Sequence, residues 1–285
     1  MENLREPAVA GAFYPSNPDA LADDIRGYLR EAEKAAVEGE IIGLISPHAG
    51  YAYSGQVAAY AYKLVEGMDF DDVVVIAPSH QWPFEGASIY HRGGFRTPLG
   101  VVAIDGDMCD EIMAFDRRFQ FIPEAHAREH SLEVQLPFLQ VSLEGYMLVP
   151  IVLMGGAGYE ICQSLGEAIS KSVKGRNCLI VASSDLTHSY NYQEVVTQDE
   201  ILARHVDQFD IDGLAEDLRK ARCQACGEGP ILTAMMAAKA LGGDRGKVLK
   251  LTNSGDVTGD KRPGNYTVGY LASVFYATGM RKEAP

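Results

Sequence analysis

The segment Val73-Val74-Val75-Ile76 runs directly into the polar cluster Ala77-Pro78-Ser79-His80. A short β-branched run bounded by turn residues is typical of a buried strand in a parallel sheet. The same change from an apolar run to a polar cluster with histidine occurs twice more, in residues 41–51 and 178–188. Ligands of open α/β sheets bind beyond the carboxyl ends of such strands. We therefore expect His48, His80 and His188 to converge at one sheet edge, as in a catalytic or metal site.

The chain alternates strand and helix patterns, which predicts one domain over residues 1–285. Its expected fold class is α/β, an α/β/α domain with a central mixed, mostly parallel sheet. Strands are predicted at 41–46, 72–77, 146–153 and 178–183, and helices at 17–37, from Ser54, at 107–115, at 158–173 and over 193–222. Residues 86–105 are predicted to form short antiparallel pieces. Strands 247–253 and 266–276 are expected to pair antiparallel at an edge of the sheet.

Two further helices are predicted from single residues. Ser131 is expected to cap a helix that Pro137 kinks or shortens. Cys226 is expected to open a helix that ends near residue 241, with Pro230 in its first turn.

The bulk composition limits the partners and the compartment. The formal net charge is −14 and the isoelectric point is about 4.9, so we predict no nucleic-acid partner. Five cysteines without framework spacing indicate a reducing compartment. Residues 1–15 contain no apolar signal core, and no run of about 18 apolar residues occurs. These features predict a cytoplasmic protein with no membrane association.

His48 and His80 have equivalent positions after their predicted strands. Imidazole is the commonest metal ligand in proteins, and two histidines at equivalent strand ends strengthen the case for each other. The alternative is that each histidine only hydrogen-bonds the end of its strand.

Cys226 belongs to a single CxxC motif with Cys223, and a zinc ribbon requires two such pairs. Its place at a predicted helix start favours the thiolate, because amide groups and the helix dipole stabilise negative charge there. A thiolate can act as a nucleophile or as a metal ligand. The alternative is an inert buried thiol, which is the expectation for Cys109, Cys162 and Cys178.

Asp185 and His188 lie three residues apart after a predicted strand. A carboxylate beside an imidazole commonly orients a general base or a metal ligand, although Asp185 could instead cap a helix. In the cluster of His126, Glu129, His130 and Glu133, the residues His130 and Glu133 can share a helix face, and His130 is a candidate pocket residue. His126 and Glu129 are as well explained by a solvated loop. His91 and His205 are interpreted as surface residues.

Taken in order, these motifs resemble those of the Memo family over nearly the whole chain. The matching segments are Ala10-Gly11-Ala12-Phe13-Tyr14, Ser46-Pro47-His48-Ala49-Gly50-Tyr51, Ala77-Pro78-Ser79-His80, Arg96-Thr97-Pro98-Leu99, Glu129-His130-Ser131-Leu132-Glu133, Ser183-Ser184-Asp185 with His188, and Cys226-Gly227 with Pro230-Ile231. Archaeal and bacterial members are similar to one part of a system that also includes an AMMECR-type protein and a radical-SAM protein. The resemblance thus implies these two as partner proteins.

The Memo family resembles the class III extradiol dioxygenases in fold, which hold Fe(II) with two histidines and a carboxylate. The resemblance implies that His48, His80 and Cys226 are metal ligands, with a thiolate in place of the carboxylate; Glu228 is a lower-ranked alternative. It also implies that His188 is an acid–base residue with Asp185 beside it, and that His130 lines the pocket. The expected cofactor is iron (Fe2+) or copper, with zinc as a substitute.

Three functions are compatible with this pattern. One is a metal-dependent oxidoreductase acting on a small molecule or a partner protein. The second is a non-catalytic scaffold that binds a peptide in the old active-site cleft, and the third is a metal chaperone. The sequence leaves the substrate, the native metal and any oligomer open.

Overall fold

The structure, a computed structural model, describes residues 3–279 and is built on a nine-stranded mixed sheet within that range. The strands follow the order β10-β12-β2-β9-β3-β8-β4-β7, and β11 pairs with β12. They span Glu40–Ser46 (β2), Asp72–Ser79 (β3), Ala87–Ile89 (β4), Phe119–Gln120 (β7), Met147–Met154 (β8), Cys178–Ser183 (β9), Asp185–Ser189 (β10), Arg245–Asn253 (β11) and Thr267–Ala277 (β12). A small separate sheet contains β1 (Leu4–Arg5), β5 (Gly94–Thr97) and β6 (Gly100–Ala103).

The centre of the large sheet is parallel. Strand β9 pairs in parallel with both β2 and β3, and β3 pairs in parallel with β8. On either side, β12 is antiparallel to β2 and β4 is antiparallel to β8. This arrangement confirms the predicted α/β fold with a mixed sheet, and it restricts the continuous parallel part to four central strands.

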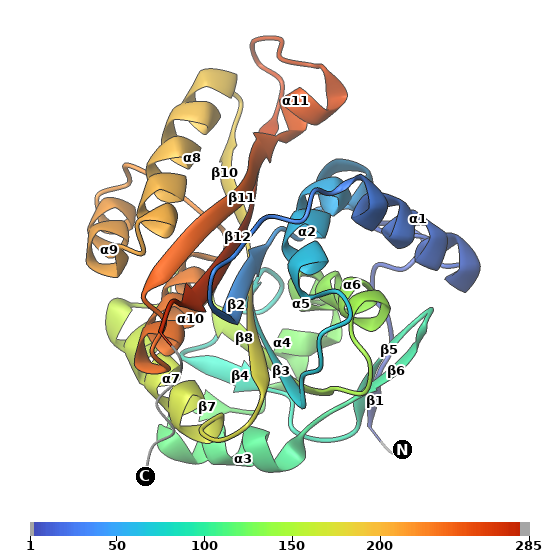
Figure 1. Cartoon of the computed structure of the whole chain (residues 1–285), viewed down its shortest axis with the longest axis vertical. Coiled ribbons are helices and arrows are strands. Elements are labelled where there is room, and N and C mark those ends of the chain that lie inside the picture. The colour runs from blue at the N-terminus through green and yellow to red at the C-terminus, as the bar shows by residue number, and fades with distance from the viewer. Residues whose placement is uncertain (1–2, 280–285) are drawn as a thin grey trace.

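Helices cover both faces of the large sheet (Figure 1). One face carries α1 (Pro18–Glu31), α2 (Tyr51–Val65), α5 (His130–Glu133) and α6 (Gln135–Ser142), and the other carries α3 (Gly106–Phe115), α7 (Tyr159–Ser172), α8 (Tyr192–Asp207), α9 (Ile211–Arg219) and α10 (Glu228–Ala240). The short helices α4 (Pro123–Ala127) and α11 (Ser254–Thr258) complete the helices within residues 3–279. Because both faces are covered, residues 73–77 of β3 are completely buried, which explains their unbroken apolar sequence.

The first helix is shorter than the predicted 17–37. Asn17 caps α1 by accepting a hydrogen bond from the amide of Ala20, and the helix ends at Glu31. Beyond it the chain approaches β12 so closely that a Cβ atom on Gly39 would lie 2.1 Å from the carbonyl oxygen of Ala277. The C-cap residue Ala32 is already extended, with φ −77° and ψ 126°, so the helix does not continue to residue 37.

The helix predicted over 193–222 is two helices, α8 and α9. Phe209 has a positive φ of 54°, and Asp210 caps α9 by accepting from the amide of Gly213. The surface position predicted for His205 is wrong. Its Nδ1 and Nε2 atoms each lie 2.9 Å from a carboxylate, of Asp210 and Asp217 respectively, and the residue is buried.

The helix predicted to begin at Ser131 is instead the pair α5 and α6. Glu129, rather than Ser131, caps α5, because its side chain accepts from the amides of His130 and Ser131. The helical run is interrupted at Val134, between α5 and α6, and Pro137 is the third residue of α6, so the expectation that Pro137 shortens the helix is met.

Strands β11 and β12 form the predicted antiparallel pair. β12 also pairs with β2 and β10, so it joins the two strands β10 and β11 to the rest of the sheet.

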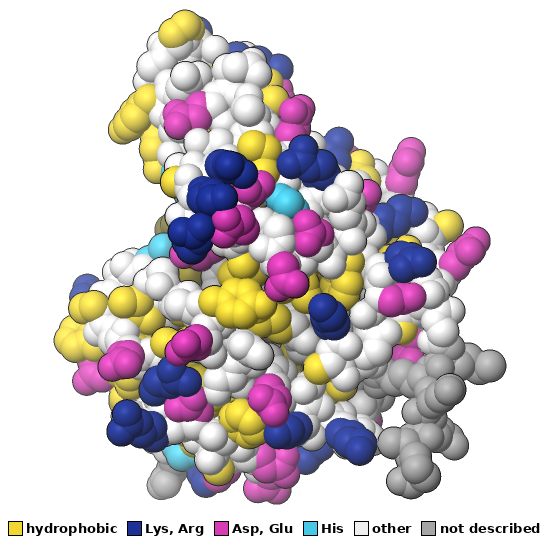
Figure 2. All heavy atoms as spheres, turned by 90° about the vertical axis from the view of Figure 1, so that its left-hand side faces the viewer, with side chains coloured by type: hydrophobic (Ala, Val, Ile, Leu, Met, Phe, Trp, Pro, Cys, Tyr) yellow, Lys and Arg dark blue, Asp and Glu magenta, His cyan; other side chains and the backbone are white. Residues whose placement is uncertain are grey.

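On the face in Figure 2, acidic side chains lie beside the basic ones rather than leaving a broad basic surface. Within residues 3–279, no helix has both the length and the apolar character needed to cross a membrane.

Candidate metal centre

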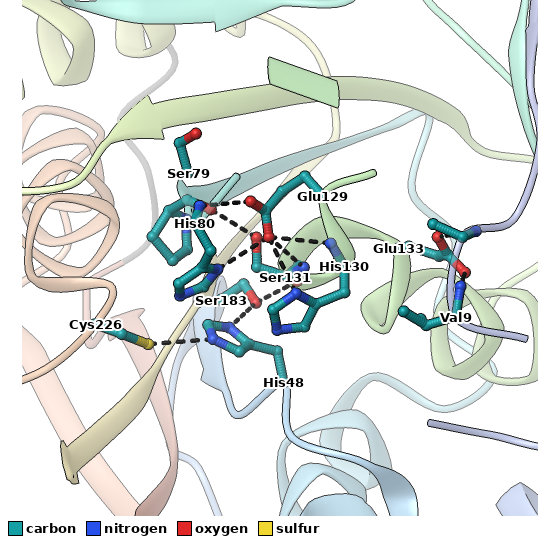
Figure 3. A network of polar contacts seen from close by, with 12 residues as sticks. Val9, His48, Ser79, His80, Glu129, His130, Ser131, Glu133, Ser183 and Cys226 are labelled. Atoms are coloured by element: carbon teal, nitrogen blue, oxygen red, sulfur yellow. Dashed lines mark hydrogen bonds and ion pairs between the residues drawn. The ribbon is translucent and has the colours of Figure 1, made fainter. Parts of the chain in front are cut away.

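The three strands predicted to end at a common edge are β2, β3 and β9, and the ends of β2 and β3 lie on either side of β9. His48 follows β2 and His80 follows β3, while β9 lies between these strands and ends at Ser183. Ser46 pairs directly with Ser183, which aligns the ends of β2 and β9. The carboxyl ends of adjacent parallel strands therefore bring the two imidazole rings together, with their centroids 5.3 Å apart (Figure 3).

Cys226 joins these histidines from the turn before α10. The ligand atoms of His48, His80 and Cys226 all lie within 4.8 Å of one another, and Cys226 Sγ is 3.1 Å from His48 Nε2. The other group of potential ligands among residues 3–279 is formed by His80, Glu129 and His130. Glu228 and Cys223 belong to neither group, so the geometry favours Cys226 over both.

Gly227 allows the Cys226 turn to lie against the end of β9. The amide of Cys226 donates to the carbonyl of Asp185, and the amide of Gly227 donates to Ser184 Oγ at 2.9 Å. A Cβ atom on Gly227 would lie only 2.5 Å from the carbonyl oxygen of Ser183. A residue with a side chain at 227 would therefore clash with the end of β9 at this distance.

Each of the two histidines has a partner at Nδ1. His48 Nδ1 lies 2.9 Å from Ser183 Oγ, and His80 Nδ1 lies 2.9 Å from Glu129 Oε1. A carboxylate can only accept, so Nδ1 of His80 carries a proton in this contact and Nε2 is the nitrogen left to face a metal ion. This is the usual arrangement of a metal-binding histidine.

Glu129 is the main acceptor of the cluster, and the solvated-loop interpretation of this residue is wrong. It is 2% exposed, and it also accepts from the amide of His80 and lies 3.3 Å from Nδ1 of His130. Burial opposes ionisation of this carboxyl, but the hydrogen bonds from His80 and from the amide of Ser131 outweigh burial and hold its pKa at about 2. His126, the other residue given that interpretation, is 1% exposed.

His130 lies beside the two strand-end histidines. Its ring stacks on His80 with centroids 4.9 Å apart and contacts His48 edge-on at 5.5 Å. Phe13 covers another side of the ring at 5.0 Å. Next to His80, a cavity of about 240 Å³ is lined by Ser79, His80, Gln81, Trp82, Pro83, Met154 and Gly155.

Arg5 is a residue that sequence reasoning missed. It is buried, donates to the carbonyls of His126 and Glu129, and pairs with Glu133. Glu133 also accepts from the hydroxyl of Tyr14 at 2.5 Å. These contacts attach the amino-terminal segment to the loop that supplies Glu129 and His130. No local pattern around Arg5 predicts this role, since its partners are more than 120 residues away.

The chain matches a family model described as Memo-like protein over residues 5–274. The chain belongs to the Memo family. A MEMO1 family protein of Methanocaldococcus jannaschii is 37% identical over 291 residues, covering 96% of this chain and 99% of the relative. MEMO1 family proteins of Nitrosopumilus maritimus and Thermoplasma acidophilum are 34% and 37% identical, and each match covers 95% of this chain, with 99% and 98% of the relative. The resemblance drawn from the motifs is thus confirmed.

In this Memo family member Asp185 and His188 do not form a pair. Asp185 lies in β10 rather than at a helix start, and its Oδ1 accepts from the amide of His48 at 2.8 Å. Burial raises the pKa of Asp185 to about 7. His188 Nδ1 instead contacts the carbonyl of Leu186 at 2.9 Å. Asp185 therefore positions the loop of His48, and the expectation that it orients His188 is wrong.

The charge state of Cys226 differs from the helix-start expectation. Burial, followed by the charge of Asp185, raises the pKa of the Cys226 thiol, and this outweighs the favourable amide groups. Burial, followed by the neighbouring histidines, lowers the pKa of His48 well below its usual range. Without a cation the two groups are therefore a neutral thiol and a neutral imidazole, which is the wrong pair for an activated nucleophile.

The donor set fits a metal ion. Two imidazole nitrogens and one sulfur match the ligand types that zinc, copper and iron accept in proteins. Ligands at about 2.0 and 2.3 Å from a tetrahedral ion are roughly 3.5 Å apart. The 3.1 Å between Cys226 Sγ and His48 Nε2 needs to widen by only a few tenths of an ångström. Binding would also replace the thiol proton, since the ligand form of cysteine is the thiolate.

Proposed function

We propose that this Memo family protein binds an iron or copper ion through His48, His80 and Cys226 and uses it in redox chemistry on a small molecule or peptide. The observation that carries the proposal is the convergence of these donors, from three separate elements, within 4.8 Å. A His₂Cys set is softer than two histidines with a carboxylate and suits either metal. Zinc would occupy the same donors without redox activity.

When bound, the metal would supply a one-electron redox centre with positions left open for a ligand. The residues of the chain orient the ligands and accept a proton. Glu129 holds the His80 ring through Nδ1, and Asp185 holds the backbone of His48. His188, whose Nδ1 contacts a carbonyl oxygen, has Nε2 available to accept a proton. We assign it the acid–base role that the likeness to class III extradiol dioxygenases implies, without assigning dioxygenation.

One observation favours a second candidate, a scaffold that binds a peptide. Tyr190 and Tyr266 are 68% and 54% exposed, and their rings lie 5.0 Å apart. Tyr266 also lies 6.0 Å from the ring of His188, so this exposed aromatic pair lies beside the candidate acid–base residue. A scaffold of this kind predicts peptide affinity that survives removal of the metal, whereas the redox proposal predicts that the reaction is lost.

The test of the proposed function is the metal content of anaerobically purified protein, measured beside its oxygen consumption with a reductant. The proposal expects about one equivalent of iron or copper and metal-dependent turnover. His48→Ala should lose both. His91→Ala is the matched control, because His91 contacts Asp110 away from the three donors. Wild-type protein that binds neither metal under these conditions would contradict the proposal.

A further inference from the structure

Ser183, the last residue of β9, lies at the centre of the hydrogen bonds beneath His48. Its side chain is completely buried. Its Oγ atom lies 2.6 Å from the carbonyl of Ser131 and 2.9 Å from Nδ1 of His48 (Figure 3). A third polar neighbour is Nε2 of Gln135, at 2.8 Å. The direction of each of these bonds follows from what the partners can donate.

A serine hydroxyl has one hydrogen to donate. The carbonyl of Ser131 can only accept, so it receives that hydrogen. The amide nitrogen of Gln135 can only donate. Contacts at both ends of the side-chain amide show which atom is the nitrogen and which is the oxygen. Nε2 also contacts the carbonyl of Pro47 at 2.9 Å, while Oε1 accepts from the hydroxyl of Tyr62 at 2.7 Å. Ser183 Oγ therefore has only a lone pair left for His48.

We propose that Ser183 is a positioning residue that fixes His48 as the tautomer protonated at Nδ1, which leaves Nε2 as the nitrogen that binds the metal. Nε2 is the atom that faces Cys226 Sγ, so this tautomer directs the lone pair toward the other donors. The inference deepens the proposed function and rests on it for the identity of the ligand set. The tautomer itself exists without a metal and can be measured without one.

The two metal-site histidines thus donate from Nδ1 to acceptors of different charge. His80 donates to the carboxylate of Glu129, which is charged, whereas His48 donates to a neutral hydroxyl. His48 is 2% exposed and already borders the carboxyl of Asp185. A neutral partner orients the His48 ring without adding a charged carboxylate beside the buried carboxyl of Asp185.

The test is the imidazole ¹⁵N–¹H correlation spectrum of metal-free protein labelled with ¹⁵N-histidine, with His48 assigned from His48→Gln. We expect wild-type His48 to be protonated at Nδ1. Ser183→Ala should lose that preference and shift His48 toward the Nε2-protonated form. Ser183→Thr, which keeps the hydroxyl, should retain it. Ser88→Ala is the control, because it removes a buried hydroxyl from another histidine, His126, at 2.9 Å.

Zinc affinity, measured by competition with a chelator, is the second readout. Loss of a partner that orients a metal ligand typically weakens binding about 10–100-fold, and we expect Ser183→Ala to fall in that range while Ser88→Ala stays at the wild-type value. If no variant binds zinc but the tautomer behaves as described, the role of Ser183 stands and the proposed metal function fails. Wild-type His48 protonated at Nε2, or a Ser183→Ala spectrum identical to the wild-type spectrum, would overturn the inference. The wild-type spectrum decides the matter even if Ser183→Ala does not fold.

Discussion

The Sγ atom of Cys226 lies 3.1 Å from Nε2 of His48, although the two residues are 178 positions apart in the chain. Burial keeps both groups neutral in the absence of a cation, since it raises the pKa of the thiol and lowers that of the imidazole. A neutral pair of this kind has no use as a nucleophile and base. We propose that a metal ion replaces the thiol proton and turns the pair into two ligands of one site.

The identity of the third ligand can be tested by comparing three substitutions. Cys226→Ser should weaken zinc binding by more than the roughly 10–100-fold typical of losing an outer partner, because it removes a ligand. Cys223→Ser and Glu228→Ala should keep wild-type affinity, because neither residue belongs to the cluster of donors. The measurement is chelator competition on folded protein. Full affinity in Cys226→Ser together with loss in Glu228→Ala would assign the site to the carboxylate.

The role proposed for His188 separates an enzyme from a storage site. His188→Ala should retain the metal, because His188 lies outside the group of donor atoms. Turnover with reductant and O₂, or with the true substrate, should fall about 10²–10⁴-fold, which is the usual contribution of a general acid–base residue. Metal content and O₂ consumption are measured side by side for both proteins. Equal turnover in the two proteins would remove His188 from the chemistry.

The buried Arg5–Glu133 pair should matter for stability. Arg5→Met leaves the carboxylate of Glu133 buried without its cation, and such a change typically costs about 3–5 kcal/mol in the free energy of unfolding. Arg96→Met is the matched control, since its pair with Glu6 is exposed and contributes about 0–1 kcal/mol. Denaturant unfolding measures both variants. A similar decrease in the free energy of unfolding in the two variants would show that burial of the Arg5–Glu133 pair does not increase its contribution to stability.

Asp199 should make the protein less stable as the pH rises. It is buried in α8, accepts from the amide of Thr187, and burial raises its pKa to about 7. The folded state therefore binds more protons than the unfolded state between pH 4 and 7, so stability falls across that range. Asp199→Asn keeps an acceptor without the charge. At about 1.4 kcal/mol per pKa unit, it should be roughly 2–4 kcal/mol more stable than wild type at pH 8 and equal to it near pH 4.

Asp217 provides the opposite case for the same unfolding experiment. Hydrogen bonds from His205, and then from Arg222, outweigh burial and lower the pKa of Asp217. Its stabilising effect is present above the ordinary aspartate pKa and is lost as the pH falls through the lowered value. Asp217→Asn should therefore destabilise the protein at neutral pH but not in acid. The same pH dependence in both variants would contradict the assignment of Asp199.

The sequence predicts the strand ends because an apolar run followed by a polar cluster can be recognised from neighbouring residues alone. The apolar run before His80 identifies a buried strand, and parallel strands end at a common edge. Glu129 and Ser183 could not be assigned in this way, since their contacts with His80 and His48 depend on loops that meet only in the folded chain. The break between α8 and α9 was missed because Phe209, rather than a glycine, adopts the positive φ.

The charge state of Cys226 was mispredicted for a related reason. Its position beside a helix start is visible in the sequence, and that position alone favours the thiolate. The burial that reverses this preference depends on the residues packed around it in the folded chain.

The central claim is that one sulfur and two imidazole nitrogens of this chain bind the same metal ion. X-ray absorption at the zinc edge of zinc-loaded protein tests it most directly, because zinc–sulfur and zinc–nitrogen distances differ, at about 2.3 Å and 2.0–2.1 Å. We predict one sulfur and two imidazole nitrogens in wild-type protein, and no sulfur in Cys226→Ser. A wild-type spectrum without sulfur, or an unchanged sulfur shell in Cys226→Ser, would contradict the account.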